Sequence, residues 1–155
     1  MFQIPRAPLF LGLAGLLPFL VGALVANGLL NTNMGDPAQG GYPLVTAKDG
    51  LGMLVLYGTV ILSFMSGVLW GFATKAEGTF ATRGYVLSVI PALWAFFSGG
   101  GAQTSTLFSL MIGFVGLLAL DYYFYRQNLT PPWWMRLRIL LTSIVVICLG
   151  FGALA

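Results

Sequence analysis

The sequence has no histidine, one cysteine and few charged side chains, and each shortage excludes a class of protein. Cys148 has no second cysteine with which to form an internal disulfide, and in an apolar segment it should be an inert small hydrophobe. Metal and haem sites would lack the histidine and cysteine ligands that usually hold them. With no histidine and four acidic residues, general acid–base catalysis has few candidate groups. We therefore expect no catalytic residue, no metal site and no enzyme activity.

Charged residues make up only 7% of the chain, whereas a soluble domain contains about 25%. Hydrophobic residues make up 58%, and the mean hydropathy is +0.91. A water-facing surface cannot be built from so few charges, so the chain is predicted to be an integral membrane protein. The apolar runs are continuous and do not alternate, which favours helices over a β-barrel. The net charge of +3 is small and scattered, so a nucleic-acid partner is not expected.

The fold class predicted for residues 1–155 is all-α, as a single transmembrane domain. We expect a bundle of five transmembrane helices, at about residues 9–26, 51–73, 84–98, 106–123 and 137–155. The first segment follows Arg6 and resembles a signal peptide, but its apolar run exceeds the roughly 7–15 residues usual there. It is therefore interpreted as a transmembrane helix that stays on the chain, with a kink at Pro18. Residues 27–50 are rich in Gly, Pro, Asn and Asp, which predicts a loop.

The segment at residues 84–98 is the weakest of the five, because its helix would rise only about 22 Å against an apolar core of about 30 Å. A re-entrant segment is the alternative. Five full crossings place six basic residues on one side of the membrane and only Lys48 on the other, a bias that a re-entrant segment would remove. Because basic residues gather on the cytoplasmic side, we predict five crossings, with the N-terminus in the cytoplasm and the C-terminus outside. The six residues are Arg6, Lys75, Arg83, Arg126, Arg136 and Arg138.

Asp121 is the most unusual charge, since a carboxylate within a transmembrane helix is costly and usually has a partner or a function. It lies within about a turn of the predicted cytoplasmic interface. The favoured interpretation is structural: Arg126, Arg136 or Arg138 pairs with Asp121 and joins the fourth span to the fifth. A proton or ligand role is the alternative. One carboxylate alone makes a poor proton relay, because transporters use several intramembrane polar groups.

Trp133 and Trp134 follow two prolines, directly before the last apolar segment. Tryptophan at the level of the lipid headgroups and proline at the start of a helix are both typical of a span that begins at the membrane surface. We therefore interpret the pair as an interfacial anchor. The alternative, an aromatic cage for a ligand, requires side chains from several elements.

Ser63, Gly67 and Gly71 recur every four residues in the second span. Such a stripe of small residues lets another helix approach closely. The sequence leaves open whether that helix belongs to this chain or to another protein.

Two further tryptophans lie within predicted spans. Trp70 is near the cytoplasmic end of its span, where membrane proteins carry aromatic belts. Trp94 is close to Pro91 in the outer half of its span, and a buried indole N–H needs an acceptor. A carbonyl freed by Pro91 is the favoured acceptor. The alternative is a bound lipid, quinone or pigment that contacts Trp70, Pro91 and Trp94.

Three segments of the chain resemble the transmembrane protein 69-like family: residues 11–20, 57–73 and 131–149. The most specific blocks read S-F-x-x-G-x-x-W-G, from Ser63 to Gly71, and W-x-x-R-L-R, from Trp133 to Arg138. The resemblance covers almost the whole chain. It implies a multi-span inner-membrane protein of proteobacteria with mitochondrial relatives, and it implies no activity, cofactor or catalytic residue.

Two functions fit this sequence. The favoured one is a non-enzymatic accessory or assembly subunit of a larger energy-transducing complex, respiratory or photosynthetic, in the bacterial inner membrane. The alternative is a small membrane carrier that binds a lipid, quinone or pigment. The first predicts other integral membrane chains as partners, in addition to membrane lipids. The second predicts a bound small molecule, although no cofactor is required by any motif.

Overall fold

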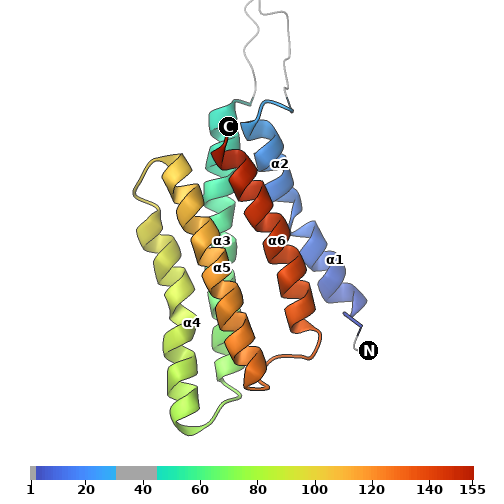
Figure 1. Cartoon of the computed structure of the whole chain (residues 1–155), viewed down its shortest axis with the longest axis vertical. Coiled ribbons are helices and arrows are strands. Elements are labelled where there is room, and N and C mark those ends of the chain that lie inside the picture. Colours follow the sequence, from blue (N-terminus) through green and yellow to red (C-terminus); the bar gives the residue numbers. More distant parts are fainter. Residues whose placement is uncertain (1–2, 31–44) are drawn as a thin grey trace, which may run out of the picture.

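The computed structural model describes residues 3–30 and 45–155, and within these ranges the chain is entirely helical apart from its turns. Five stretches are long and apolar enough to cross a membrane, which confirms the predicted multi-span helical class (Figure 1). The first span, Arg6–Ala26, consists of two helices in sequence. The helices are α1 (Arg6–Ala14), α2 (Leu17–Ala26), α3 (Ala47–Ala73), α4 (Gly78–Ser98), α5 (Gln103–Arg126) and α6 (Trp134–Ala153).

The first span is interrupted directly before Pro18, where the sequence predicts a kink. Proline has no N–H to donate to the carbonyl four residues earlier, and its ring crowds that carbonyl. The backbone therefore leaves the helix at Gly15 and Leu16. The Tyr57 hydroxyl of α3 donates a hydrogen bond of 3.0 Å to the Gly15 carbonyl and so stabilises the break.

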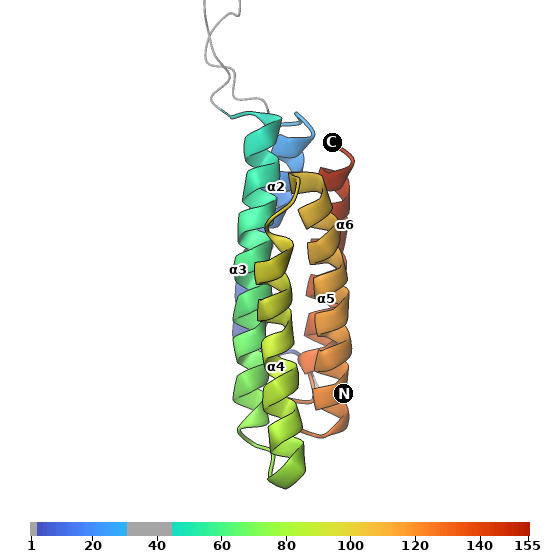
Figure 2. The ribbon, with the colours of Figure 1, turned by 90° about the vertical axis from the view of Figure 1, so that its left-hand side faces the viewer.

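The span expected to be the shortest is long enough to cross the membrane. α4 begins at Gly78, six residues before the predicted start at position 84, and its 21 residues rise about 32 Å. The first turns of α4 contain polar residues, so the apolar run that predicts the span begins later than the helix itself. The helix continues through Pro91 and extends along most of the length of the bundle, which disfavours the re-entrant alternative (Figure 2).

α3 contacts α2, α4, α5 and α6, while α6 also contacts α1, α2 and α5. The hydrophobic core is built mainly from leucine and phenylalanine side chains that these helices bury between them. Glycine allows the closest approach. At Gly50 of α3, a Cβ atom would collide with the backbone of α2 at Ala26 and would lie 2.8 Å from the Gly22 carbonyl oxygen.

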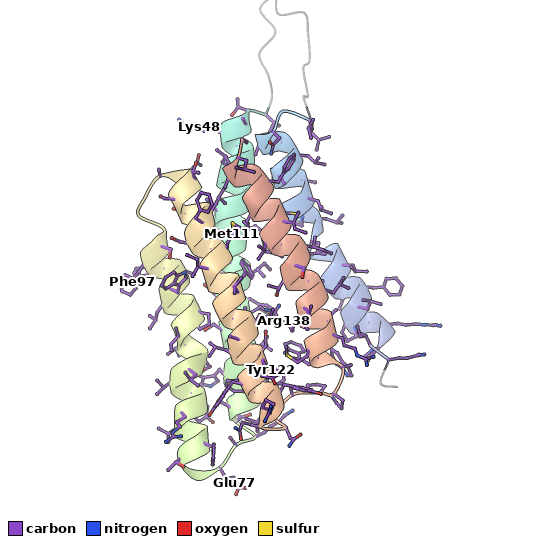
Figure 3. All side chains as sticks on the ribbon, viewed as in Figure 1. Lys48, Glu77, Phe97, Met111, Tyr122 and Arg138 are labelled. Atoms are coloured by element: carbon purple, nitrogen blue, oxygen red, sulfur yellow. The ribbon has the colours of Figure 1, made fainter. Side chains whose placement is uncertain are left out.

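The basic residues gather at one end of the bundle. α1 begins, α3 ends, α4 begins, α5 ends and α6 begins at the same end, and the two chain termini lie at opposite ends (Figure 1). Lys48 lies at the other end, across the bundle from Glu77 (Figure 3). The predicted loop at residues 27–50 falls mostly outside the described residues, and α3 begins within it at Ala47.

Candidate functional site

Asp121 lies where the last turns of α5 meet the first turns of α6, and its side chain is fully buried. Its Oδ2 atom accepts a hydrogen bond of 2.6 Å from Nε of Arg138, with which it forms an ion pair. Its Oδ1 atom accepts a hydrogen bond of 2.8 Å from the indole N–H of Trp134. Positions 134 and 138 are one helical turn apart and share a face of α6. Both carboxylate oxygens of α5 are therefore held by one face of α6.

Arg138 is almost as inaccessible as Asp121, with an exposed fraction of 4%. Burying two charges costs free energy, which their attraction offsets only when hydrogen bonds satisfy both groups. The pair has no net charge, and the Trp134 N–H supplies a further donor to the carboxylate. What the arrangement does directly is to join α5 to α6 near the basic end of the bundle.

The other two candidate arginines lie apart from this pair. Arg126 is exposed at the end of α5 and donates a hydrogen bond of 3.3 Å to the Tyr122 hydroxyl. Arg136 is exposed on α6, two residues before Arg138 and so on another face of the helix. Of the three arginines that the sequence offers to Asp121, the structure pairs Arg138 with it.

Trp134, in α6, contacts two further helices, α3 and α5. It is half-buried, and its ring meets that of Phe72 in α3 edge to face, with centroids 5.0 Å apart. Trp133 is also half-buried, with its ring centroid 6.0 Å from that of Trp134. Trp134 thus links α3, α5 and α6, a role that the interfacial reading of the sequence did not include.

A cavity of about 240 Å³ adjoins the pair, and sequence reasoning did not predict it. It lies among α1, α2, α3, α5 and α6, and Arg138 and Thr142 are the polar side chains on its wall. Thr142 is 3% exposed and comes four residues after Arg138, on the same face of α6. That spacing is the one sequence signal that could have drawn attention to Thr142.

Trp94 finds its hydrogen-bond acceptor on a neighbouring helix. Its indole N–H donates to the Ser109 carbonyl of α5 at 2.7 Å, so the predicted acceptor, a carbonyl freed by Pro91 within α4, is wrong. Gly113 makes this approach possible, because a Cβ atom there would lie 2.8 Å from Trp94 Cδ1. Pro91 and Trp94 line an apolar cavity of about 290 Å³ between α4 and α5.

Trp70 does not reach that cavity wall. It is half exposed on α3, and its ring lies 4.7 Å from that of Tyr85 on α4. The three residues assigned by sequence to one lipid or pigment contact are therefore not brought together around a single cavity among the described residues.

Gly67 and Gly71 of the small-residue stripe are exposed on α3. No side chain or neighbouring backbone in residues 3–30 and 45–155 lies within 4 Å of where their Cβ atoms would be. Ser63, at the start of the stripe, is partly buried. The close helix contacts inside the bundle are made at other glycines, among them Gly50 and Gly113.

Comparison with known proteins confirms the family indicated by the sequence blocks. A family model described as protein of unknown function (DUF3429) matches residues 4–154. Transmembrane protein 69 of Xenopus tropicalis is 31% identical over 153 residues, which are 94% of this chain and 53% of that protein. The chain thus spans about half the length of the curated relative that it matches. No solved structure matches it significantly.

Proposed function

Since the chain belongs to the DUF3429 family, a family of unknown function, we propose from its own features that it is a non-enzymatic accessory or assembly subunit. It would belong to, or help to assemble, a larger energy-transducing complex, respiratory or photosynthetic, in the bacterial inner membrane. The bacterial and mitochondrial relatives implied by the family resemblance favour such a membrane. The single observation that carries the proposal is the exposed stripe on α3.

We call this stripe the small-residue face, and it consists of Ser63, Gly67 and Gly71. Helices in lipid associate by close packing, for which small residues are required at the contact. The internal contact at Gly50 uses this chemistry, and there the neighbouring helix lies directly against the glycine. The positions at Gly67 and Gly71 offer the same chemistry with open space beside them.

Large exposed side chains border the small-residue face. Phe64 is 63% exposed and Trp70 is 49% exposed, and both flank the glycines on α3. α3 lies along one edge of the bundle (Figure 2). A transmembrane helix of another protein is the partner whose backbone could approach Gly67 and Gly71 while its side chains contact these aromatic rings.

The proposed orientation places the basic end of the bundle in the cytoplasm. Six of the seven Lys and Arg residues belong to helix ends or turns on that side, and cytoplasmic loops carry such an excess. Reporter fusions at the C-terminus test this orientation. Periplasmic activity of the reporter is expected, and a cytoplasmic C-terminus would overturn it.

Purification from native membranes in a mild detergent tests the partner role. The chain should co-migrate with a respiratory or photosynthetic complex, and Gly67→Leu or Gly71→Leu should remove it from that complex. Gly116→Leu is the matched control, because Gly116 is also exposed and open but lies on α5. It should leave the association unchanged, and all three variants should melt at the temperature of the parent chain.

Two results would refute the role. One is a chain that migrates alone, as a monomer or homodimer, under conditions that preserve the membrane complexes. The other is an association that survives both Gly67→Leu and Gly71→Leu.

A further inference from the structure

The cavity beside the Asp121–Arg138 pair combines an apolar wall with two buried polar groups. Apart from Arg138 and Thr142, the wall is made of apolar side chains and glycine, and it includes the rings of Phe19 and Phe114. Pockets for small molecules have this composition: mostly apolar surface, with a few polar groups that fix the orientation of the ligand.

The two polar side chains each hold a buried atom with no hydrogen-bond partner in the described part of the chain. These atoms are Nη2 of Arg138 and the hydroxyl oxygen of Thr142. Within a membrane there is no bulk water to satisfy them, and a buried donor without an acceptor destabilises the fold. Because the residues are four apart on α6, both groups can reach one acceptor on the same face of the helix.

The charge of the site restricts the chemistry of that acceptor. Asp121 already neutralises Arg138, through an ion pair on Nε. A carboxylate or phosphate in the cavity would add a second negative charge close to Asp121 in a medium of low dielectric constant. A neutral oxygen avoids this cost. A carbonyl oxygen carries two lone pairs, which match one guanidinium N–H and one hydroxyl.

The cavity opens toward the lipid. Leu11 of α1 and Phe64 of α3 both line it, and they are 75% and 63% exposed, so they mark an opening between these two helices. Its volume of about 240 Å³ is below the roughly 300–1,000 Å³ of pockets that enclose a whole ligand. It therefore suits the head of a molecule whose tail remains in the bilayer.

We propose that this cavity binds the carbonyl-bearing head of a neutral membrane lipophile. The carbonyl oxygen accepts hydrogen bonds from Arg138 Nη2 and the Thr142 hydroxyl, and the tail leaves between α1 and α3. Two sources supply this chemistry: an isoprenoid quinone, and the ester carbonyl of a diacyl lipid. The cavity shares no residue with the small-residue face, although Phe64 lies beside both. The binding tests below use the chain on its own, so they do not depend on the proposed partner role.

Thr142→Val is the decisive variant, because it removes the hydroxyl and keeps the shape of the side chain. Thr106→Val is its matched control. Thr106 is also buried, but its hydroxyl is shared between the carbonyl oxygens of Ala102 and Ser98. Thr106 does not line the cavity. Ile61→Phe is a second variant, which narrows the cavity from α3 without changing a polar group.

The first experiment uses the full chain in nanodiscs of a diether phospholipid, which has no ester carbonyl. A short-tailed 1,4-benzoquinone is titrated, and binding is followed by quenching of tryptophan fluorescence. The second uses native mass spectrometry to compare retention of a diester phospholipid with that of the diether lipid of the same headgroup. Thr142→Val should weaken the specific binding about fivefold to tenfold, as expected for the loss of one hydrogen bond. Ile61→Phe should weaken it as well, and Thr106→Val should not.

Saturable quinone binding that is sensitive to Thr142→Val identifies a quinone as the ligand. Preferential retention of the diester lipid with the same sensitivity identifies a lipid ester. Either result supports the carbonyl site. The proposal is overturned if neither probe binds specifically, if the diether lipid is retained as well as the diester and no quinone binds, or if Thr142→Val and Ile61→Phe both bind like the parent.

Discussion

The two halves of the first membrane span pack in opposite ways. α2 buries Phe19, Gly22, Ala23, Val25 and Ala26, whereas α1 buries none of its residues. α2 lies against α3 with backbones in close contact at Gly50, and Asn27 at its end donates a hydrogen bond of 2.9 Å to the Phe151 carbonyl of α6. α1 diverges from the bundle and leaves the cavity at Arg138 beside it (Figure 1).

The difference shows how one helix break divides a span into a packed half and an open half. At the α2 end the contacts are made by glycine and by a neutral hydrogen bond. At the α1 end the helices are joined by a buried ion pair between α5 and α6, and α1 contributes little to the core. The two ends are thus stabilised by different interactions, and substitutions at the two ends should have different consequences.

The largest effect is expected for Asp121→Asn, at the open end. This change leaves Arg138 as an uncompensated buried charge, for which the cost is about 3–5 kcal/mol. The melting temperature of the purified chain in detergent should fall by several degrees. Arg126→Gln is the control, since Arg126 is exposed and bonds to Tyr122, and it should melt like the parent.

A double-mutant cycle sharpens this result. Asp121→Asn combined with Arg138→Gln should be less destabilised than the sum of the two single changes, because the second removes the unpaired charge. Asp121→Asn with Arg126→Gln should be additive. Additivity in the Asp121–Arg138 cycle would contradict the pairing as a source of stability.

Sequence reasoning reached the multi-span helical class because the composition indicates a membrane protein and the order of the residues shows long, continuous apolar runs. It also placed Asp121 near three arginines, but it could not choose among them. The choice depends on which face of α6 meets α5, and this face carries Trp134 and Arg138 one turn apart. The start of α4 at Gly78 was missed, because polar residues at a membrane surface do not distinguish a helix from a loop.

The cavity was beyond sequence reasoning for another reason. Its walls come from five helices, and its volume depends on how far α1 leans away from α3 and α6. No local sequence pattern predicts the angle between α1 and these helices. That the Thr142 hydroxyl lacks a hydrogen-bond partner among the described residues likewise depends on how the surrounding helices pack, which the sequence does not show.

The next effect in size is expected for Trp134→Phe. The ring is kept against Phe72, but the N–H donor to Asp121 Oδ1 is lost. A hydrogen bond to a charged group contributes about 1.5–3 kcal/mol, and the free energy of unfolding should fall by that amount. Trp133→Phe is the control and should have a smaller effect. Equal losses in the two variants would show that the ring, and not the N–H group, stabilises this end.

Gly50→Ala tests the packed end of the comparison. A methyl group at this position collides with the α2 backbone, so α2 and α3 must separate, at a cost of about 1–3 kcal/mol. Gly52→Ala, two residues along the same helix, should be neutral or slightly stabilising, because its Cβ would lie 3.5 Å from the Gln103 side chain. Thermal unfolding of the two variants side by side measures the difference. A neutral Gly50→Ala would mean that the packed end is looser than the backbone contact indicates.

The smallest effect is expected for Asn27→Ala, at the same packed end. The Asn27 amide donates to the Ala23 carbonyl of its own helix at 3.0 Å and to the Phe151 carbonyl of α6, so the change removes one link between helices. Its loss should cost about 0.5–1.5 kcal/mol in thermal unfolding. Ser143→Ala, which removes a hydroxyl that donates to the Ile139 carbonyl of its own helix, is the control and should cost less. Because the packed end is also held by backbone contact at Gly50, Asn27→Ala should leave ligand binding at the Arg138 cavity unchanged. Weakened binding in this variant would mean that the two halves of the first span move together, and that the break before Pro18 does not separate them.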